Sequence, residues 1–254
     1  MLNKNFISHL LLSFCLMQYN PDQTCIILAG GLGTRLAPIL NGKPKCLAQI
    51  NNKNFLKILL KSLWIRGIEK FILALGYGSQ EVIDEIKKPW TKNFKIKYIV
   101  EEKKLGTGGA IKNALKEVDN DECIVLNGDT LITGNINVMK TKLDTNNSEL
   151  VRIGLLKVSN SSRYGGVKID KQSFITDFIE KGLTNESLIN TGLYRIHKSI
   201  FKNINSEIFS FEEFISKEVK KNKSTKGAIL TGSFIDIGIP EDYKFLCEHE
   251  RDYA

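Results

Sequence analysis

Residues 25–36 read CIILAGGLGTRL, an apolar run that breaks into a glycine-rich turn carrying one arginine. Such a run predicts a buried strand, and the glycines of the turn let backbone N–H groups approach an anion closely. Arg35 adds a fixed positive charge and a planar fork of hydrogen-bond donors. The turn therefore predicts a phosphate site. The alternative is a tight strand-to-helix turn that binds nothing.

A dinucleotide-binding turn is the commonest rival interpretation of this motif. It needs a glycine where Leu36 stands, and an acidic partner for the ribose about twenty residues further along. No Asp or Glu occurs between Gly30 and Ile68. The charged residues of that segment are all basic: Arg35, Lys43, Lys45, Lys53, Lys57, Lys61 and Arg66. The segment thus favours a polyphosphate ligand and speaks against an unrelated dinucleotide-dependent oxidoreductase.

The overall composition limits what can be built around that turn. With 254 residues and 42% apolar content, the chain can bury one large α/β core, or one core plus a small subdomain, and we favour one continuous domain. The net charge is +8, but the basic residues are mixed with 28 acidic ones and form no Lys/Arg-rich tail. This pattern favours a small anionic substrate over nucleic acid.

The cysteine and histidine content narrows the chemistry further. The five cysteines are odd in number, widely scattered and without a Cys-x-x-Cys pair, which predicts reduced thiols and a cytoplasmic protein. The sequence contains only three histidines, His9, His197 and His249. It therefore does not favour a histidine-rich metal site or a Ser-His-Asp catalytic arrangement.

The first 23 residues differ from the rest of the chain. Lys4 and the apolar run at 6–16 resemble a short signal-peptide core, but no small-x-small cleavage site follows and the run is too short to span a bilayer. We interpret residues 1–23 as an extension outside the core. Secretion, and a start at Met17, are the alternatives. The expected division is one domain at 24–245 and a C-terminal tail at 246–254, with no stable membrane contact.

Short apolar runs alternate with amphipathic segments over the first 160 residues. Strand-like runs occupy 25–28, 70–75, 96–100, 123–126 and 151–158, and helical patterns occupy 54–66, 80–87 and 109–118. This alternation predicts an α/β fold with a Rossmann-like, mostly parallel sheet flanked by helices. Shorter runs at 165–170, 175–180, 189–196 and 232–237, with a helix at 211–221, predict a mixed-sheet half that forms the second wall of a pocket. Ligands of such sheets bind beyond the carboxyl ends of the strands.

A second glycine turn occurs at residues 105–112, which read LGTGGAIK. It predicts the start of a helix whose N-terminus attracts phosphate. The sequence contains no Gly-Lys-Ser/Thr, which disfavours P-loop chemistry. The alternative is a helix start whose glycines serve only close packing.

Two aspartates follow strand-like runs, which places them at the edge of the sheet. Asp129 ends the run 123–129, and Asp236 stands in the run 234–242, FIDIGIPED. Mg²⁺ prefers one or two protein carboxylates together with substrate phosphate oxygens and water. The pair therefore predicts a magnesium site, although a strand-end aspartate is also an ordinary turn residue.

The chain from Gln23 to Tyr243 resembles the sugar-1-phosphate nucleotidyltransferases, because several elements of that family occur in its order. These elements are residues 28–36, Pro44-Lys45, residues 105–110, Asn127-Gly128-Asp129, Glu180-Lys181 followed by Asn190-Thr191-Gly192, and residues 236–242. Cys46 and Gly182 stand where the family usually has proline. Neither departure removes a charged group, so both concern the shape of loops.

The resemblance implies a reaction in which a sugar 1-phosphate oxygen attacks the α-phosphorus of a nucleoside triphosphate and releases pyrophosphate. By motif, Arg35 holds the β- and γ-phosphates, Lys45 lies near the reacting phosphates, and Asp129 with Asp236 binds Mg²⁺. The nucleotide contacts implied are Leu28, Gly30, Gly31, Gly33, Thr34, Glu101, Gly106 and Thr107. The sugar-phosphate contacts implied are Asn127, Gly165, Glu180, Lys181 and Asn190. A homo-oligomer fits the resemblance as well.

The base and the sugar are inferred from finer features. Glu101 aligns with the family position that faces the nucleobase, and a carboxylate suits the adjacent N1–H and N2–H₂ donors of guanine, which favours GTP. Residues 105–110, 209–212 and 234–238 look most like the branch that acts on D-glycero-D-manno-heptose 1-phosphate, for surface polysaccharide synthesis. The alternatives are mannose-1-phosphate guanylyltransferase, a glucose-1-phosphate thymidylyl- or uridylyltransferase, and an inactive regulatory homologue.

Overall fold

The computed structural model describes residues 23–31, 33–159, 163–179 and 187–253. Two predicted sugar-site residues, Glu180 and Lys181, lie outside these ranges, and the side chain of Thr34 is also not described. Within these ranges, no helix has the length and apolar character needed to cross a membrane.

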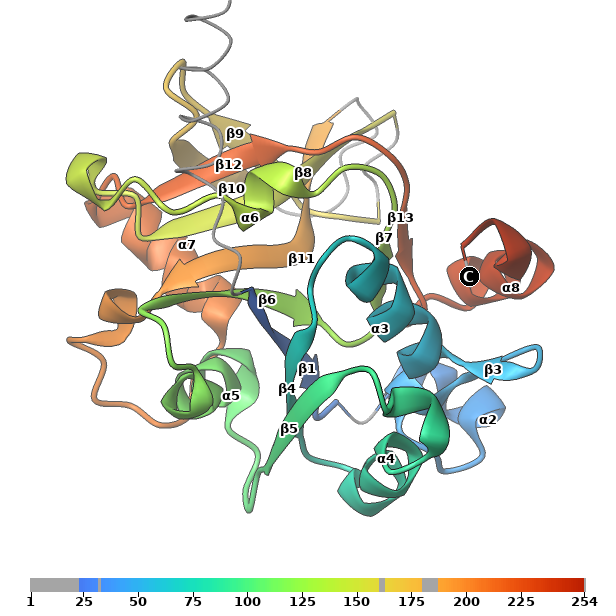
Figure 1. Ribbon diagram of the computed structural model, residues 1–254. Coiled ribbons are helices and arrows are strands. Elements are labelled where there is room, and N and C mark those ends of the chain that lie inside the picture. The colour runs from blue at the N-terminus through green and yellow to red at the C-terminus, as the bar shows by residue number, and fades with distance from the viewer. Residues whose placement is uncertain (1–22, 32, 160–162, 180–186, 254) are drawn as a thin grey trace, which may run out of the picture.

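A mixed sheet forms the centre of the described structure (Figure 1). Its strand order is β10-β9-β11-β6-β1-β4-β5; in addition, β8 pairs with β11, and β12 pairs with β8. Strands β6, β1, β4 and β5 are parallel, whereas β11 runs antiparallel to β6, β8 and β9. The predicted α/β fold with a mixed half is therefore confirmed. The strands of this sheet are β1 (Thr24–Ala29), β4 (Lys70–Leu75), β5 (Lys95–Val100), β6 (Glu122–Asn127), β8 (Val151–Val158), β9 (Gly166–Ile169), β10 (Ile175–Ile179), β11 (Ser187–His197) and β12 (Thr225–Ile229).

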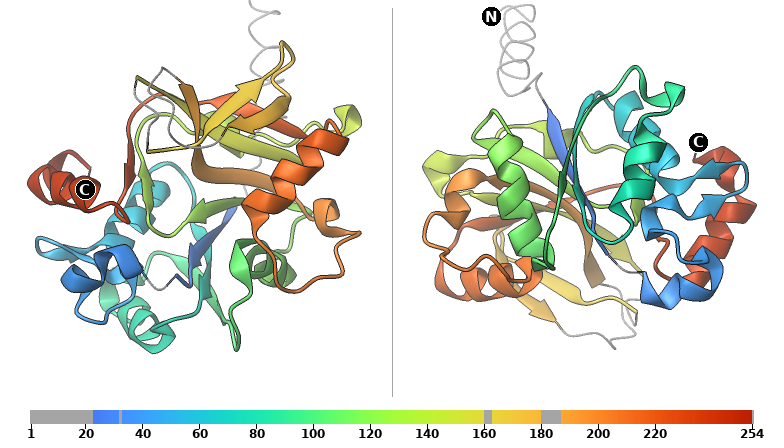
Figure 2. Two further views of the ribbon diagram at one scale, coloured as in Figure 1. Left: turned by 180° about the vertical axis from the view of Figure 1, so that it is seen from behind. Right: turned by 90° about the horizontal axis from the view of Figure 1, so that it is seen from below.

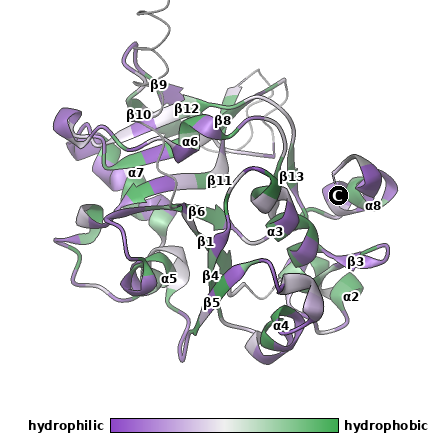
Figure 3. Cartoon of the chain, in the orientation of Figure 1, coloured by the Kyte–Doolittle hydropathy of each residue, from purple (hydrophilic) through white to green (hydrophobic). Residues whose placement is uncertain are grey.

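Helices cover both faces of the sheet. Successive residues of a strand point to opposite faces, and the central strands are apolar at successive positions, so both faces are apolar and are covered. Cys25 and Ile27 of β1 pack in one cluster with α3 and α4, while Ile26 packs in a second cluster with α5 and α7. Figure 2 shows the helices on opposite sides of the strands, and Figure 3 shows the apolar residues concentrated on the central strands. The α-helices are α2 (Ala37–Leu40), α3 (Phe55–Ile65), α4 (Ser79–Ile86), α5 (Gly106–Ala114), α6 (Asn137–Lys140), α7 (Phe211–Lys221) and α8 (Pro240–Glu248).

Two short strand pairs lie beside the main sheet. Strand β7 (Thr130–Ile132) pairs antiparallel with β13 (Phe234–Asp236), and β2 (Gln49–Ile50) pairs with β3 (Lys53–Asn54). Helix α8 packs back on the β2–β3 hairpin, because Tyr243 donates a hydrogen bond to the carbonyl of Gln49 at 2.6 Å. The β7–β13 pair matters for the site because it joins the segments that carry Asp129 and Asp236.

Helix α5 begins earlier than the sequence predicts, at Gly106 rather than at residue 109. The segment around residue 209 lies so close that a Cβ on Gly109 would overlap the carbonyl of Glu207, and one on Gly106 would lie 2.6 Å from that of Phe209. The glycines are thus required by packing within the helix as well as by the turn. Local propensity alone assigns them to the turn.

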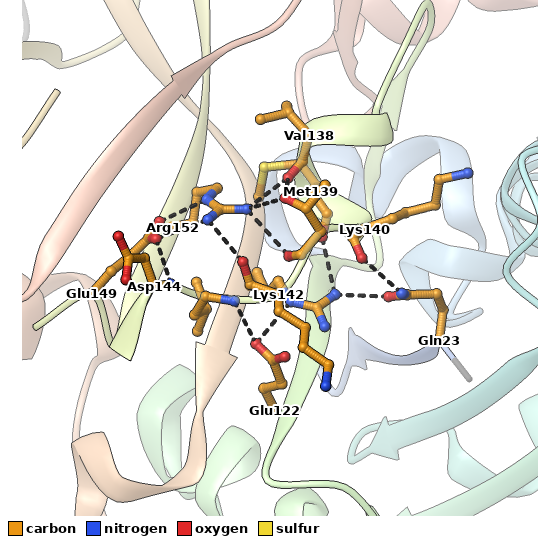
Figure 4. A network of polar contacts seen from close by, with 12 residues as sticks. Gln23, Glu122, Val138, Met139, Lys140, Lys142, Asp144, Glu149 and Arg152 are labelled. Carbon is orange, nitrogen blue, oxygen red and sulfur yellow. Dashed lines mark hydrogen bonds and ion pairs between the residues drawn. The ribbon is translucent and has the colours of Figure 1, made fainter. Parts of the chain in front are cut away.

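A buried polar network anchors the edge of the sheet away from the strand carboxyl ends (Figure 4). Arg195 of β11 is fully buried, and its guanidinium donates to Glu122 at 3.0 Å, to the side chain of Gln23 at 2.7 Å and to the carbonyl of Met139 at 3.2 Å. Glu122 also accepts a hydrogen bond from the backbone of Leu143 at 2.9 Å. Because Glu122 begins β6 and Asn127 ends it, the network lies at the opposite end of that strand from the predicted site.

We expect Arg195→Lys to lower the free energy of unfolding by about 1–3 kcal/mol, because lysine keeps the charge but not the donor fork and leaves a buried acceptor unpaired. Urea unfolding measures this loss, and turnover should stay unchanged. The exposed Arg251→Lys is the matched control and should shift stability by less than about 0.5 kcal/mol. Equal stability of the two variants would contradict the anchoring role of Arg195.

Candidate active site

The carboxyl ends of β1 and β6 bring the glycine turn and the Asn-Gly-Asp element together. Leu28 of β1 is the register partner of Asn127 of β6, and the backbone N–H of Gly128 donates to the carbonyl of Leu28 at 2.9 Å. A Cβ on Gly128 would lie 2.6 Å from that carbonyl oxygen, so only glycine allows this approach. Asp129 therefore lies next to the turn that follows β1.

A lysine and two aspartates meet at this edge of the sheet. Lys45 forms an ion pair with Asp129, and its side chain is only 14% exposed. Asp236 lies beside Asp129, because β13 pairs with β7 in the register Asp236 to Thr130 and the N–H of Ile237 donates to the carbonyl of Asp129 at 3.0 Å. The sequence-predicted catalytic lysine and both predicted metal ligands are thus brought together.

The surroundings of Asp236 penalise its charged form. Burial raises the pKa of this carboxyl, and the negative charge of Asp129 raises it further. The N–H of Gly238, which donates to Asp236 at 2.8 Å, and the charges of Lys45 and Arg35 act in the opposite direction without cancelling the rise. A carboxylate held in this way gains most from an added cation.

Two cavities meet at Asp129. A smaller one of about 250 Å³ lies over the turn after β1, and a larger one of about 450 Å³ lies over the mixed half of the sheet. Asn127 and Asp129 line both of them. The smaller cavity is also lined by Leu28, Gly30, Gly31, Glu101, Gly106 and Thr107, and the larger one by Arg35, Gly165, Asn190 and Asp236.

Six of the eight predicted nucleotide contacts line the smaller cavity; Gly33 does not, and the side chain of Thr34 is not described. Gly33 has a positive φ of 62° and packs against Lys45, where a Cβ would lie 3.1 Å from that of the lysine. Arg35 lines the larger cavity instead of the smaller one. The glycine turn therefore supports the lysine directly, and its arginine reaches the side of the site where Asp236 lies.

Glu101 directly follows β5 and lines the smaller cavity. Its carboxylate accepts a hydrogen bond from the N–H of Leu105 at 3.3 Å, which holds the start of α5 against it. Burial raises the pKa of Glu101, and the bond from Leu105 only partly offsets that rise. The carboxylate is therefore a positioned acceptor facing the smaller cavity.

A bulge in β11 positions Asn190 at the larger cavity. Gly192 has a positive φ of 71° and a Cβ there would lie 2.5 Å from the amide of Asn127, so glycine is needed at the bulge. The side chain of Asn190 accepts from the N–H of Gly192 at 2.9 Å and donates to the hydroxyl of Tyr194 at 2.9 Å. These two bonds fix the orientation of the amide toward a ligand.

The carboxylate pair fits a magnesium ion by its donor set. Asp129 and Asp236 supply oxygen ligands from two adjoining segments, and Mg²⁺ takes one or two carboxylates and completes its shell with phosphate oxygens and water. No group of three or more His, Cys, Asp or Glu that could hold a metal occurs among the residues the structure describes. The arrangement therefore suits an ion that arrives with a phosphate ligand.

The structure adds Tyr164 and Tyr194, which no family motif contains, and it gives a place in the site to Glu212 and Gly238, which lie in the motifs at 209–212 and 236–242. Tyr164, Tyr194 and Glu212 line the larger cavity, and a Cβ on Gly238 would overlap the ammonium of Lys45. Glu212 lies in the first turn of α7, where Ser210 caps the helix by accepting from the N–H of Glu213 at 3.2 Å. The Ser-x-x-Glu pattern signals a helix start, but it gives no sign that this start borders a cavity.

Comparison with known proteins agrees with this geometry. A model of the family described as nucleotidyl transferase matches residues 24–250. The chain is 45% identical over 219 residues to the D-glycero-alpha-D-manno-heptose 1-phosphate guanylyltransferase of Campylobacter jejuni, covering 86% of this chain and 96% of the relative. It is 38% identical to the enzyme of the same name from Aneurinibacillus thermoaerophilus, covering 86% and 94%.

A solved structure is also similar over most of its length. HddC from Yersinia pseudotuberculosis, in a crystal structure described as complexed with GMP-PN, matches with a TM-score of 0.80 and 36% identity. The match covers 90% of this chain and 99% of HddC. The similarity in sequence and in structure extends across both cavities.

Proposed function

Because the chain belongs to the nucleotidyl transferase family, we propose that it transfers guanylate from GTP to D-glycero-D-manno-heptose 1-phosphate. The products are pyrophosphate and a nucleotide-sugar, which serves surface polysaccharide synthesis. The nucleoside triphosphate substrate places the reaction in the cytoplasm. The observation that carries the proposal is the meeting of two cavities at Asp129, with Lys45 and Asp236 beside it.

Each cavity suits one of the two substrates. The smaller one, with its glycine turns and the carboxylate of Glu101, accommodates the nucleotide, and the larger one, with Asn190 and Gly165, accommodates the sugar. The shared wall at Asn127 and Asp129 is where the reacting phosphates meet. Holding the two anions in line there converts a bimolecular encounter into a positioned reaction.

The chemistry needs positioning and charge neutralisation more than a protein nucleophile. An oxygen of the sugar phosphate forms a bond to the α-phosphorus of GTP, and the bond from that phosphorus to the bridging β-phosphate oxygen breaks, which releases pyrophosphate. We assign to Lys45, through its ion pair with Asp129, the neutralisation of negative charge on the α-phosphate, and to Arg35 the binding of phosphate oxygens by its fork of donors. Asp129 and Asp236 hold Mg²⁺, which when bound supplies positive charge to the phosphate oxygens.

Pyrophosphate release tests the proposal directly. The protein is mixed with Mg²⁺, one of GTP, UTP or dTTP, and heptose 1-phosphate or mannose 1-phosphate, and the nucleotide-sugar is identified by mass. We expect the highest turnover with GTP and the heptose phosphate, and its abolition by a chelator. Preferential use of UTP or dTTP would contradict the base assignment, and preferential use of mannose 1-phosphate the sugar assignment.

Glu101→Gln tests how the base is recognised. Guanine offers two adjacent donors to the carboxylate, whereas glutamine replaces one acceptor with a donor. We expect the preference for GTP over UTP to fall by about 10-fold or more, measured as the ratio of kcat/KM values. The neighbouring Glu102→Gln, on an exposed residue, is the matched control.

The pH dependence of KM for GTP gives an independent check. Because burial raises the pKa of Glu101, its carboxylate takes up a proton at a higher pH than a free glutamate does. On acidification, KM for GTP should therefore rise in the unmodified protein, and this rise should be absent in Glu101→Gln. An unchanged base preference together with an unchanged pH profile would remove Glu101 from the nucleotide site.

A further inference from the structure

A side cavity adjoins the larger cavity beside α7. Its volume is about 130 Å³, and it shares Phe178, Asn190, Tyr194 and Glu212 with the larger cavity. The charged residues Lys45, Asp129 and Asp236 do not line it. A sugar phosphate whose phosphate lies at Asp129 therefore meets this opening with its opposite end.

The walls of the side cavity are apolar at the bottom and polar at the mouth. Ile153 of β8 and Phe211 and Ile215 of α7 form the apolar part, and Ser216 adds a hydroxyl. The volume is several times the roughly 30 Å³ that one water molecule occupies in the liquid. The space thus has room for a short, hydroxylated carbon arm.

Glu212 is held at the mouth by two hydroxyl groups. Thr107 of α5 donates to its carboxylate at 2.6 Å, and Ser210 donates to the same oxygen at 2.9 Å. A carboxylate offers about four acceptor positions, so further positions are left for the hydroxyls of a ligand. Glu212 lines both the larger cavity and the side cavity, so a ligand in either can reach it.

Tyr194 supplies the complementary donor. Its hydroxyl oxygen accepts from the amide of Asn190 at 2.9 Å, which leaves the O–H free to donate. Burial, together with the negative charge of Glu212, raises the pKa of Tyr194, so the O–H stays protonated. A ligand hydroxyl that donates to Glu212 and accepts from Tyr194 is satisfied in both directions.

We propose that Tyr194, Glu212 and Ser216 form an exocyclic subsite that binds the two-carbon arm of the heptose and so selects a heptose over a hexose. A heptopyranose 1-phosphate carries C6 and C7, each with a hydroxyl, on ring atom C5, whereas a hexose carries C6 alone. This inference rests on the proposed function, because it assumes a sugar 1-phosphate in the larger cavity. In this proposal, residues of α7 select the sugar, whereas other elements bind the phosphate groups.

Two variants test the subsite. Ser216→Leu fills the side cavity, and Glu212→Gln keeps the shape of the side chain while removing its charge. For each we expect kcat/KM with D-glycero-D-manno-heptose 1-phosphate to fall by about 10-fold or more relative to kcat/KM with mannose 1-phosphate. The matched controls, Lys217→Leu and Glu213→Gln, change adjacent exposed residues that line neither cavity and should leave that ratio unchanged.

The outcomes separate this inference from the proposed function. Parallel losses with both sugars, or an unchanged ratio in both variants, would overturn the exocyclic subsite while the reaction itself stands. If the unmodified chain formed a nucleotide-sugar from neither sugar, the proposed function would fail and the subsite with it. Thermal melting identifies a folding defect in Ser216→Leu, and Glu212→Gln then decides the question because it changes no volume.

Discussion

Replacing Asp236 with asparagine is expected to lower kcat by about 100-fold or more without lowering the stability of the metal-free protein. The loss follows from the removal of one of two carboxylates that we assign to Mg²⁺. The preserved stability follows from the raised pKa of Asp236, because burial and Asp129 make its charged form unfavourable. Turnover with GTP and Mg²⁺ affinity measured by calorimetry report the first effect, and thermal unfolding the second.

The sign of the pH dependence follows from the same pKa. Between the ordinary aspartate pKa and the raised pKa of Asp236, the folded protein binds a proton that the unfolded chain has released. The stability of the metal-free protein therefore falls as pH rises through this interval, and Asp236→Asn should remove this contribution. The exposed Asp121→Asn is the control for both readouts. Near-native turnover in Asp236→Asn would contradict the assignment of Asp236 as a second metal ligand.

The strands and helices that carry the strongest local signals are predictable from the sequence. The bounds of β4, β8 and α7 agree with the predicted runs at 70–75, 151–158 and 211–221, because each combines a clear hydrophobic period with flanking polar residues. Strand β12 was not predicted. Its sequence, Thr-Lys-Gly-Ala-Ile, has little strand propensity, and it forms because it pairs with β8, where a Cβ on Gly227 would lie 2.5 Å from Leu155.

Some residues of the candidate site can be predicted from short sequence motifs, and others only from contacts between distant parts of the chain. Strand-end aspartates have a local signature, so the sequence predicts Asp129 and Asp236 as a pair, whereas Lys45 follows from the Pro-Lys element of the family resemblance. The structure brings the three residues together. The run 209–212, which contains Glu212, is a mark of the family branch but does not assign Glu212 to a cavity, because its place there depends on the packing of α7 against β10 and α5. The assigned roles of all these residues remain predictions that substitution must test.

Lys45→Met is expected to lower kcat by about 100-fold to 1,000-fold, because it removes the only cation that forms an ion pair with Asp129 among the described residues. Methionine keeps a similar length and apolar stem, so packing against Gly33 should survive. The expected loss lies in kcat with both sugars, since the assigned role of Lys45 is at the reacting phosphates rather than at the sugar. Single-turnover kinetics with GTP measures it.

Gly238→Ala tests the same ammonium group without touching the lysine. The added methyl would overlap Nζ of Lys45 and lie 2.8 Å from Oδ1 of Asp236, so the end of the flexible lysine side chain must move away from Asp129. A catalytic group that is displaced by about one ångström slows the reaction even when the fold is intact. We therefore expect kcat to fall by about 10-fold to 100-fold with little change in thermal stability. Thermal unfolding of the variant separates this effect from a general loss of stability, because a displaced ammonium lowers kcat without lowering the melting temperature. If Lys45→Met and Gly238→Ala both retained normal turnover, the ion pair with Asp129 would be structural, and the charge on the reacting phosphates would have to be balanced elsewhere.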